Sequence, residues 1–198
     1  MRLGKTEEKR DSILQAAAKV FSKKGFYQAR IEDISREAGV GKGTVYEYFS
    51  SKEALFKNML VDLNREHFET VYEGCPPMGS VVRRLEKILV LHFKFIENQR
   101  DVGRLLIESH FSLGKEIHLW LWELQLEKIK DLAKIIDAGA AQGEFRRDVD
   151  VYLAAHIVFG AVAAVSGMII MEEIPSGKLE NLARNTLALV LRGLKVDT

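Results

Sequence analysis

Residues 34–55 read ISREAGVGKGTVYEYFSSKEAL. Three positions in this stretch have the spacing of a helix-turn-helix: Ser35, then Gly39 at the turn, then Val45 in the following helix. The small side chain lets two helices cross closely, the glycine accepts the left-handed backbone of the turn, and the branched residue packs between the helices. The spacing therefore predicts two short helices that cross one another.

Helical periodicity continues on both sides of this motif. Towards the N-terminus, Ile13, Ala17 and Val20 share one face of a helix that Gly25 ends. We expect helices at about residues 6–24, 31–38, 42–48, 51–74, 78–98, 101–112, 115–142, 149–173 and 178–195. Because the chain has only three prolines and little strand-type alternation, the sequence predicts an all-α fold of about nine helices.

The distribution of charge divides the chain into two parts. Residues 1–60 hold 12 Lys and Arg against 8 Asp and Glu, whereas residues 61–198 hold 17 against 20. A basic head on a mildly acidic body suits a nucleic-acid-binding module joined to a domain with another task. We place the boundary near residue 50, which gives domains at 1–50 and 51–198.

Cysteine usage and targeting patterns favour the cytoplasm. The single cysteine, Cys75, cannot form an internal disulfide, and the chain does not open on a signal-peptide pattern. Residues 153–171 are uncharged if His156 is neutral and are just long enough to span a bilayer. Acidic residues flank them and small residues occur within them, so we interpret the segment as a buried or dimer-interface helix and expect no membrane partner.

The motif and its surroundings carry a specific resemblance. Residues 34–55 resemble the signature of TetR-family transcriptional regulators almost position for position, and with the first helix the resemblance covers about residues 6–60. It implies an N-terminal helix-turn-helix DNA-binding domain and a C-terminal helical domain for ligand binding and dimerisation. It also implies a homodimer, joined by the last two helices, on a palindromic double-stranded operator.

The resemblance also implies which residues contact DNA. Lys42, Gly43 and Thr44 would enter the major groove, while Tyr46 and Lys52 would hold phosphates.

Some positions depart from the family pattern. Arg30 stands where the family has a capping threonine, so a cap is exchanged for a charge that can meet a phosphate. Gly41 replaces a serine cap, and Glu47 adds an acid to the recognition helix.

The C-terminal part contains more large apolar side chains than one-sided helices need, and part of that surface is expected to line a cavity. The candidate effector-binding residues are His92, Arg104, Glu108, Trp120, His156 and Phe159, with His110 and Ser166 as further polar positions. A buried polar group is costly unless protein or ligand pairs with it, so each of these is either an effector contact or a satisfied core residue.

A second resemblance concerns the effector. The segments Gly143-Glu144-Phe145 and Val158-Phe159-Gly160-Ala161 resemble the branch of the family that senses fatty acyl-CoA. This implies a small hydrophobic effector, with an acyl-CoA as the first candidate and Arg104 facing its anionic head group.

Other classes are less well supported. No metal is expected because the chain has no cysteine pair or close histidine pair, and no cofactor or catalytic motif is visible, so we do not expect an enzyme. The alternatives are a hydrophobic-ligand or lipid carrier, an enzyme on a helical scaffold, and a multidrug-sensing repressor.

Overall fold

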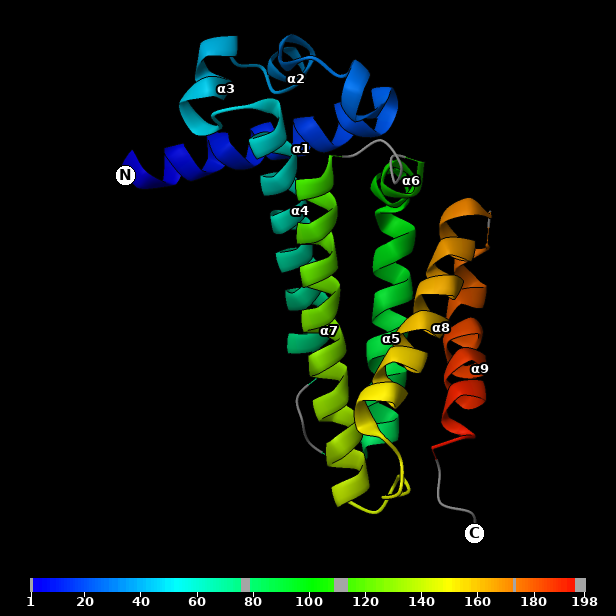
Figure 1. Ribbon diagram of the computed structural model, residues 1–198. Helices are drawn as coiled ribbons and strands as arrows, with labels where there is room; N and C mark the ends of the chain where they lie inside the picture. Colours follow the sequence, from blue (N-terminus) through cyan, green and yellow to red (C-terminus); the bar gives the residue numbers. More distant parts are fainter. Residues whose placement is uncertain (1, 76–78, 109–113, 173, 195–198) are drawn as a thin grey trace. The chain divides into compact units, whose positions relative to one another are not determined.

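The computed structural model describes residues 2–75, 79–108, 114–172 and 174–194, with only the backbone at residues 2–5 and 108. These residues form α-helices and two short helical turns, and no strand occurs among them (Figure 1). The elements are α1 (Arg2–Gln28), α2 (Ile31–Glu37), α3 (Lys42–Tyr48), α4 (Lys52–Phe68), η1 (Glu69–Glu73), α5 (Val81–Asn98), α6 (Arg100–Glu108), α7 (Lys115–Ala141), α8 (Val151–Met171), η2 (Ser176–Lys178) and α9 (Leu179–Leu191). The predicted all-α fold is confirmed.

Gly25 has φ 72° and ψ 164°, which is not a helical conformation, so the first stretch of helix ends there as predicted and the remainder of α1 follows this kink. The fourth helix differs from the prediction. The predicted fourth helix is α4 followed by η1, a π-helical turn that ends at Gly74. The predicted extension of the sixth helix to residue 112 lies outside the described residues.

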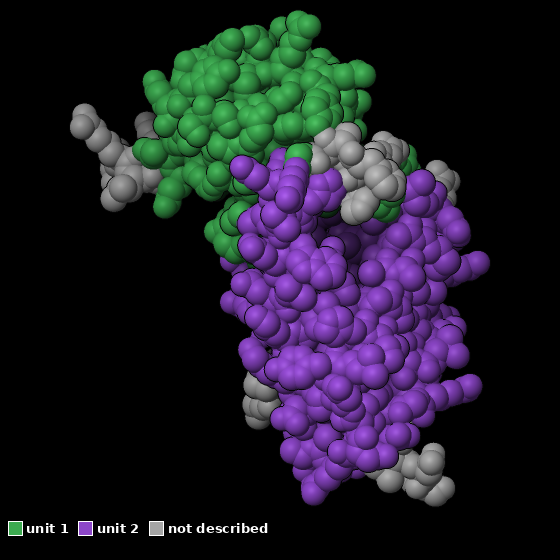
Figure 2. All heavy atoms as spheres, viewed as in Figure 1, with its two compact units in different colours: residues 1–66, 101–114 green, residues 67–100, 115–198 purple. Residues whose placement is uncertain are grey.

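The chain forms two compact units (Figure 2). The first comprises residues 1–66 and 101–114, and the second comprises residues 67–100 and 115–198. The border falls inside α4, so this one helix contributes to both units. The functional boundary near residue 50 remains a prediction, because compactness does not say which residues bind DNA or ligand.

An aromatic cluster forms the core of the first unit. The ring of Phe56 from α4 lies 5.2 Å from that of Phe21 and 5.0 Å from that of Phe26, both in α1. All three side chains are buried. The cluster attaches the start of α4 to the helix that supports the helix-turn-helix.

In the second unit, α5 packs against α7, α8 and α9. Its N-terminus is held by Glu144, which accepts hydrogen bonds from the Ser80 hydroxyl at 2.8 Å, the Val81 amide at 2.7 Å and the Val82 amide at 3.1 Å. Desolvation opposes ionisation of this carboxyl, but the three hydrogen bonds prevail and hold the pKa of Glu144 below its usual value. The segment after α7 therefore caps α5.

A close contact between Phe145 and Gly139 fixes the path of the chain as it leaves α7. Phe145 is 1% exposed and its ring lies over Gly139, where an added Cβ would come within 2.3 Å of a ring carbon. The buried ring has no room to withdraw, so glycine is required here by packing.

Replacing Gly139 by Ala should destabilise the protein by about 1–3 kcal/mol, because the new methyl group overpacks a buried contact. Chemical denaturation monitored by circular dichroism measures the change. In a Phe145→Ala background the same substitution should be neutral or stabilising by up to about 1 kcal/mol, as expected from helix propensity alone. An equal cost in both backgrounds would show that the Gly139–Phe145 contact is not the cause.

Candidate functional site

The predicted helix-turn-helix has the expected geometry. Ile34 and Val45 are fully buried where α2 and α3 cross, and Gly39 adopts φ 67° at the turn. Ser35 is 7% exposed and its hydroxyl donates to the Glu32 carbonyl at 3.1 Å, which satisfies a polar group at the crossing. The motif is confirmed residue by residue.

The first turn of α3 is the most open part of the motif. Lys42 and Gly43 are exposed, and Thr44 is half-buried. A Cβ on Gly43 would meet no atom within 4 Å, so nothing inside the chain requires glycine there. Gly41 is the N-cap and offers no side-chain hydrogen bond, so the amides at this end are free of a protein cap. Such an end can approach an anionic partner closely.

Lys42 has an acidic partner within the motif. Its ammonium pairs with Glu32 of α2 and lies 5.9 Å from the centre of the Tyr46 ring, which is 47% exposed. The hydrogen bond from Lys42 holds the pKa of Glu32 below its usual value, and the pKa of Lys42 is raised by the same contact. This carboxylate therefore competes with any phosphate that approaches Lys42.

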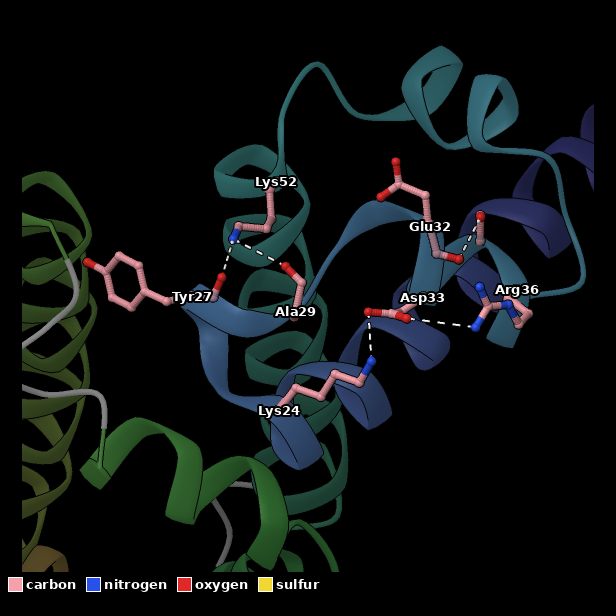
Figure 3. Close-up of polar contacts among 8 residues, drawn as sticks. Lys24, Tyr27, Ala29, Glu32, Asp33, Arg36 and Lys52 are labelled. Carbon is pink, nitrogen blue, oxygen red and sulfur yellow. Dashed lines mark hydrogen bonds and ion pairs between the residues drawn. The ribbon is translucent and has the colours of Figure 1, made fainter.

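Lys52, at the start of α4, connects distant parts of the first unit (Figure 3). Its ammonium donates to the carbonyls of Tyr27 and Ala29, both at 3.3 Å, and lies 4.7 Å from the centre of the Phe26 ring. An ammonium has three N–H donors, so one remains for an external acceptor. Lys52 thus supports the connection between α1 and α2, a role that sequence reasoning missed.

The start of α2 is organised by Asp33 (Figure 3). This carboxylate accepts from Lys24 at 2.8 Å and lies 3.9 Å from the guanidinium of Arg36. The hydrogen bond from Lys24 holds the pKa of Asp33 below its usual value. Arg30 is the N-cap of α2, is exposed and makes no side-chain cap, as predicted from the missing threonine.

The predicted effector residues are dispersed. Trp120 in α7 and Phe159 in α8 are half-buried, and His156 is exposed on α8, where it bonds the Tyr152 carbonyl of its own helix at 2.7 Å. Arg104 is exposed on α6, in the first unit. The side chain of Glu108, and all of His110, lie outside the described residues.

His92 is the predicted residue that joins a polar cluster. Its Nδ1 lies 2.8 Å from Nε2 of His67, and its Nε2 lies 3.0 Å from the Ser166 hydroxyl. Burial first and the nearby charge of Lys128 second lower the pKa of His67 to about 3 and that of His92 to about 4. Both imidazoles are therefore neutral at pH 7.

Sequence reasoning missed His67 and Lys128, although a signal exists for each. His67 follows Leu60 and Leu63 at helical spacing, and Lys128 stands between Leu124 and Leu132 on one helical stripe. A polar residue within an apolar stripe is a candidate for a buried role.

A cavity of about 260 Å³ lies elsewhere in the second unit. It is lined by Ile136, Asp137, Ala140, Ala141, Phe145, Arg146, Arg147, Val149, Val151 and Leu194. None of the predicted effector residues lines it.

The start of α3 is exposed and has no side-chain cap, and α2 and α3 cross one another. These two features define the class: this is a helix-turn-helix DNA-binding protein with a separate helical unit. Residues 13–59 match the family model for bacterial regulatory proteins of the tetR family, and residues 78–167 match that for the tetracyclin repressor-like C-terminal domain.

Comparison with known proteins gives the family. The chain is 30% identical over 151 residues to the HTH-type transcriptional repressor NicS of Pseudomonas putida, covering 75% of this chain and 71% of that protein. It is 24% identical over 186 residues to the fatty acid metabolism regulator protein of Bacillus subtilis, covering 92% and 93%. The crystal structure of FadR from Bacillus subtilis in complex with stearoyl-CoA superposes with a TM-score of 0.79 at 22% identity, covering 92% and 97%. The chain belongs to the TetR family and is a ligand-responsive, DNA-binding transcriptional repressor.

Replacing Glu32 by Gln should strengthen operator binding, because it frees Lys42 and removes a negative charge beside α3. We expect affinity to rise about 3- to 10-fold and the plot of log affinity against log salt to steepen by up to about one unit. Fluorescence anisotropy at several salt concentrations measures both.

The matched control is Glu37→Gln, which removes an exposed acid of α2 paired with Lys19 at 3.3 Å. If both variants gained equally, the effect would be one of general charge and the Glu32–Lys42 pair would have no special part in binding.

Proposed function

We propose that this repressor leaves its operator when a small hydrophobic effector, in the first place a fatty acyl-CoA, enters its second unit. The observation that carries the proposal is the likeness to a fatty acid regulator along nearly the whole chain, together with the stearoyl-CoA bound in the similar Bacillus subtilis structure. The C-terminal unit supports it through its largely apolar helices and its buried polar cluster.

The DNA contacts follow from the exposed side of the helix-turn-helix. Lys42, Gly43 and Thr44 read the major groove from the first turn of α3, where Gly43 leaves room for the DNA. Tyr46 and the remaining N–H of Lys52 hold phosphates, and Arg30 adds a phosphate contact at the start of α2. Lys52 has a structural use as well, so its substitution alone would test folding together with binding.

The operator is palindromic because the repressor binds as a homodimer. α8 is long and apolar enough to cross a membrane, with a mean hydropathy of 2.2, yet only 33% of the segment is buried in one chain. Its exposed side carries Leu153, Ile157, Ala164 and Met171, and Leu189 of α9 is 68% exposed. A second copy of the chain covers this apolar surface and forms a four-helix interface.

α4 transmits the effector signal. It carries Lys52 at one end and His67 near the other, so its residues belong to both units. Two recognition helices must be spaced by about 34–36 Å to occupy successive major grooves, so a small displacement of each α4 spoils their register. An effector that prefers the mis-spaced state by about 2–3 kcal/mol weakens operator affinity roughly 30- to 150-fold.

We place the protein in the cytoplasm, because its operator DNA is there, and we assign it no catalytic activity. A carrier protein would have no use for an open recognition helix, and a multidrug sensor would respond to cations in preference to acyl-CoA.

Titration of palmitoyl-CoA into a protein–operator complex should release the DNA, because the ligand stabilises the mis-spaced state. Fluorescence anisotropy of labelled operator measures release, with free CoA and a hydrophobic cation as comparisons. Absence of release once the protein is saturated would refute the acyl-CoA assignment, and release by the cation alone would indicate multidrug sensing.

Replacing Ala164 by Glu should give a monomer at micromolar concentration, because it places a charge in the apolar interface between copies. Ala164 is exposed in the single chain, so the fold should persist. Light scattering measures the mass, and operator affinity should fall at least about 100-fold as the paired recognition helices are lost. Lys130→Glu, on an exposed position of α7, is the matched control and should remain dimeric. A dimeric Ala164→Glu variant would exclude this face as the interface.

A further inference from the structure

The cavity of about 260 Å³ lies where α7 ends, α8 begins and the chain leaves α9 (Figure 1). Its floor is apolar, because Ile136, Phe145 and Leu194 line it and each is at most 7% exposed. Pockets for drug-sized ligands measure about 300–1,000 Å³. This cavity therefore suits a molecule much smaller than an acyl-CoA, with a compact apolar group.

Hydrogen bonds hold the walls of the cavity in place. The Phe145 amide donates to the Gly139 carbonyl at 3.2 Å, and the Arg146 amide donates to the Leu194 carbonyl at 2.9 Å. The first bond attaches the segment after α7 to that helix, and the second attaches it to the chain that follows α9. A ligand meets a cavity that is already formed, which lowers the entropic cost of binding.

The rim of the cavity carries three charged side chains, Asp137, Arg146 and Arg147, all exposed. Arg146 is compensated, because its Nε donates to the Asp148 carboxylate at 2.9 Å. Asp150 is engaged as the N-cap of α8. Among the described residues, Asp137 and Arg147 form no ion pair, either with one another or with a third side chain. They remain as one negative and one positive charge at the mouth of the cavity.

Arg147 and Asp137 lie over the same side of α7. The Arg147 Nε donates to the Ala140 carbonyl at 3.4 Å, and Asp137 precedes Ala140 by one helical turn. Residues three apart on a helix are neighbours on its surface, with about 5–6 Å between their Cβ atoms. The guanidinium is thus held close to the carboxylate without pairing with it. Its Nη groups, which have no partner in the described part of the chain, can donate two parallel bonds to a ligand carboxylate.

We propose that this cavity binds a small apolar α-amino acid. The ligand's carboxylate accepts from Arg147, its ammonium donates to Asp137, and its side chain packs on the apolar floor. An α-amino acid carries both charged groups on a single carbon atom, so the two can meet partners that are neighbours on one helix. The site goes beyond the proposed function, because its ligand is neither an acyl-CoA nor part of one.

The balance of charge favours a zwitterion over a simple acid. Since Arg146 is paired with Asp148, the groups left for a ligand have no net charge. A fatty acid of the same size would be attracted by Arg147 and repelled by Asp137 to a similar extent, whereas a zwitterion meets an opposite charge at each end.

Calorimetry on the full-length protein without DNA compares leucine with three analogues. Isocaproate is leucine without the ammonium, isoamylamine is leucine without the carboxylate, and glycine lacks the apolar side chain. We expect leucine to bind with a Kd on the order of 0.1–1 mM, and each analogue to bind about 10-fold more weakly or worse, because each loses one kind of contact.

Phenylalanine serves as a second apolar amino acid in the same measurement. If neither leucine nor phenylalanine bound at about 10 mM, the proposal would be overturned. Isocaproate binding as tightly as leucine would overturn it too, and would make the cavity a site for simple carboxylates. Either result leaves acyl-CoA release of the operator intact, because that release does not depend on this cavity.

Variants separate the two charged contacts. Asp137→Asn should weaken leucine about 10-fold without weakening isocaproate, which has no ammonium, and Arg147→Gln should weaken leucine about 10-fold without weakening isoamylamine, which has no carboxylate. Both side chains are exposed, so the fold should persist. Glu127→Gln on α7 and Arg192→Gln after α9 are matched controls at exposed positions outside the cavity, and neither should change leucine binding. Unchanged leucine binding in both rim variants would contradict the site.

Thermal unfolding gives a second readout. At about ten times its Kd, leucine should raise the Tm by about 2–4 °C, because it stabilises only the folded protein. The same concentration should raise the Tm of Glu127→Gln equally and that of Asp137→Asn by about 1 °C or less. An equal rise in Asp137→Asn would contradict the assignment of the ammonium contact.

Discussion

The packing of Phe56 against Phe21 and Phe26 is the contact through which the recognition motif depends on the rest of the chain. Each aromatic pair contributes about 0.5–1.5 kcal/mol beyond the area that it buries, and the T-shaped geometry specifies orientation as well as distance. Since Phe56 is fully buried, α4 cannot rotate about its axis in the first unit without disrupting this cluster. A displacement of α4 must therefore carry α1 and the crossed helices with it as one body.

Several lysines of the first unit are already engaged by other groups of the same unit. Lys42 is held by Glu32, and Lys24 by Asp33, so part of the basic head is neutralised locally before any partner arrives. Lys52 is engaged by two backbone carbonyls and one aromatic ring. The net excess of basic residues in the first part of the chain consequently overstates the charge that is free to meet an anion.

The sequence predicted what depends on short spacing and missed what depends on distant contacts. Ser35, Gly39 and Val45 lie within one motif, so their roles follow from local sterics. The structural use of Lys52 could not be predicted, because its acceptors, Tyr27 and Ala29, lie more than twenty residues away. His156 was expected to be buried, but it is exposed on α8. Because α8 is apolar on all sides, its sequence has no periodicity that distinguishes a buried face from an exposed one.

The π-helical turn η1 gives the end of α4 an unusual property. A π-turn contains one residue more than the α-helical turn that it replaces, so conversion between the two would shift the following residues by about 100° and roughly 1.5 Å. Val71 is fully buried within η1, while its neighbours Glu69 and Thr70 are exposed. A conversion of η1 into an α-helical turn would therefore change the register of the following residues by one residue and rotate Val71 away from its buried position.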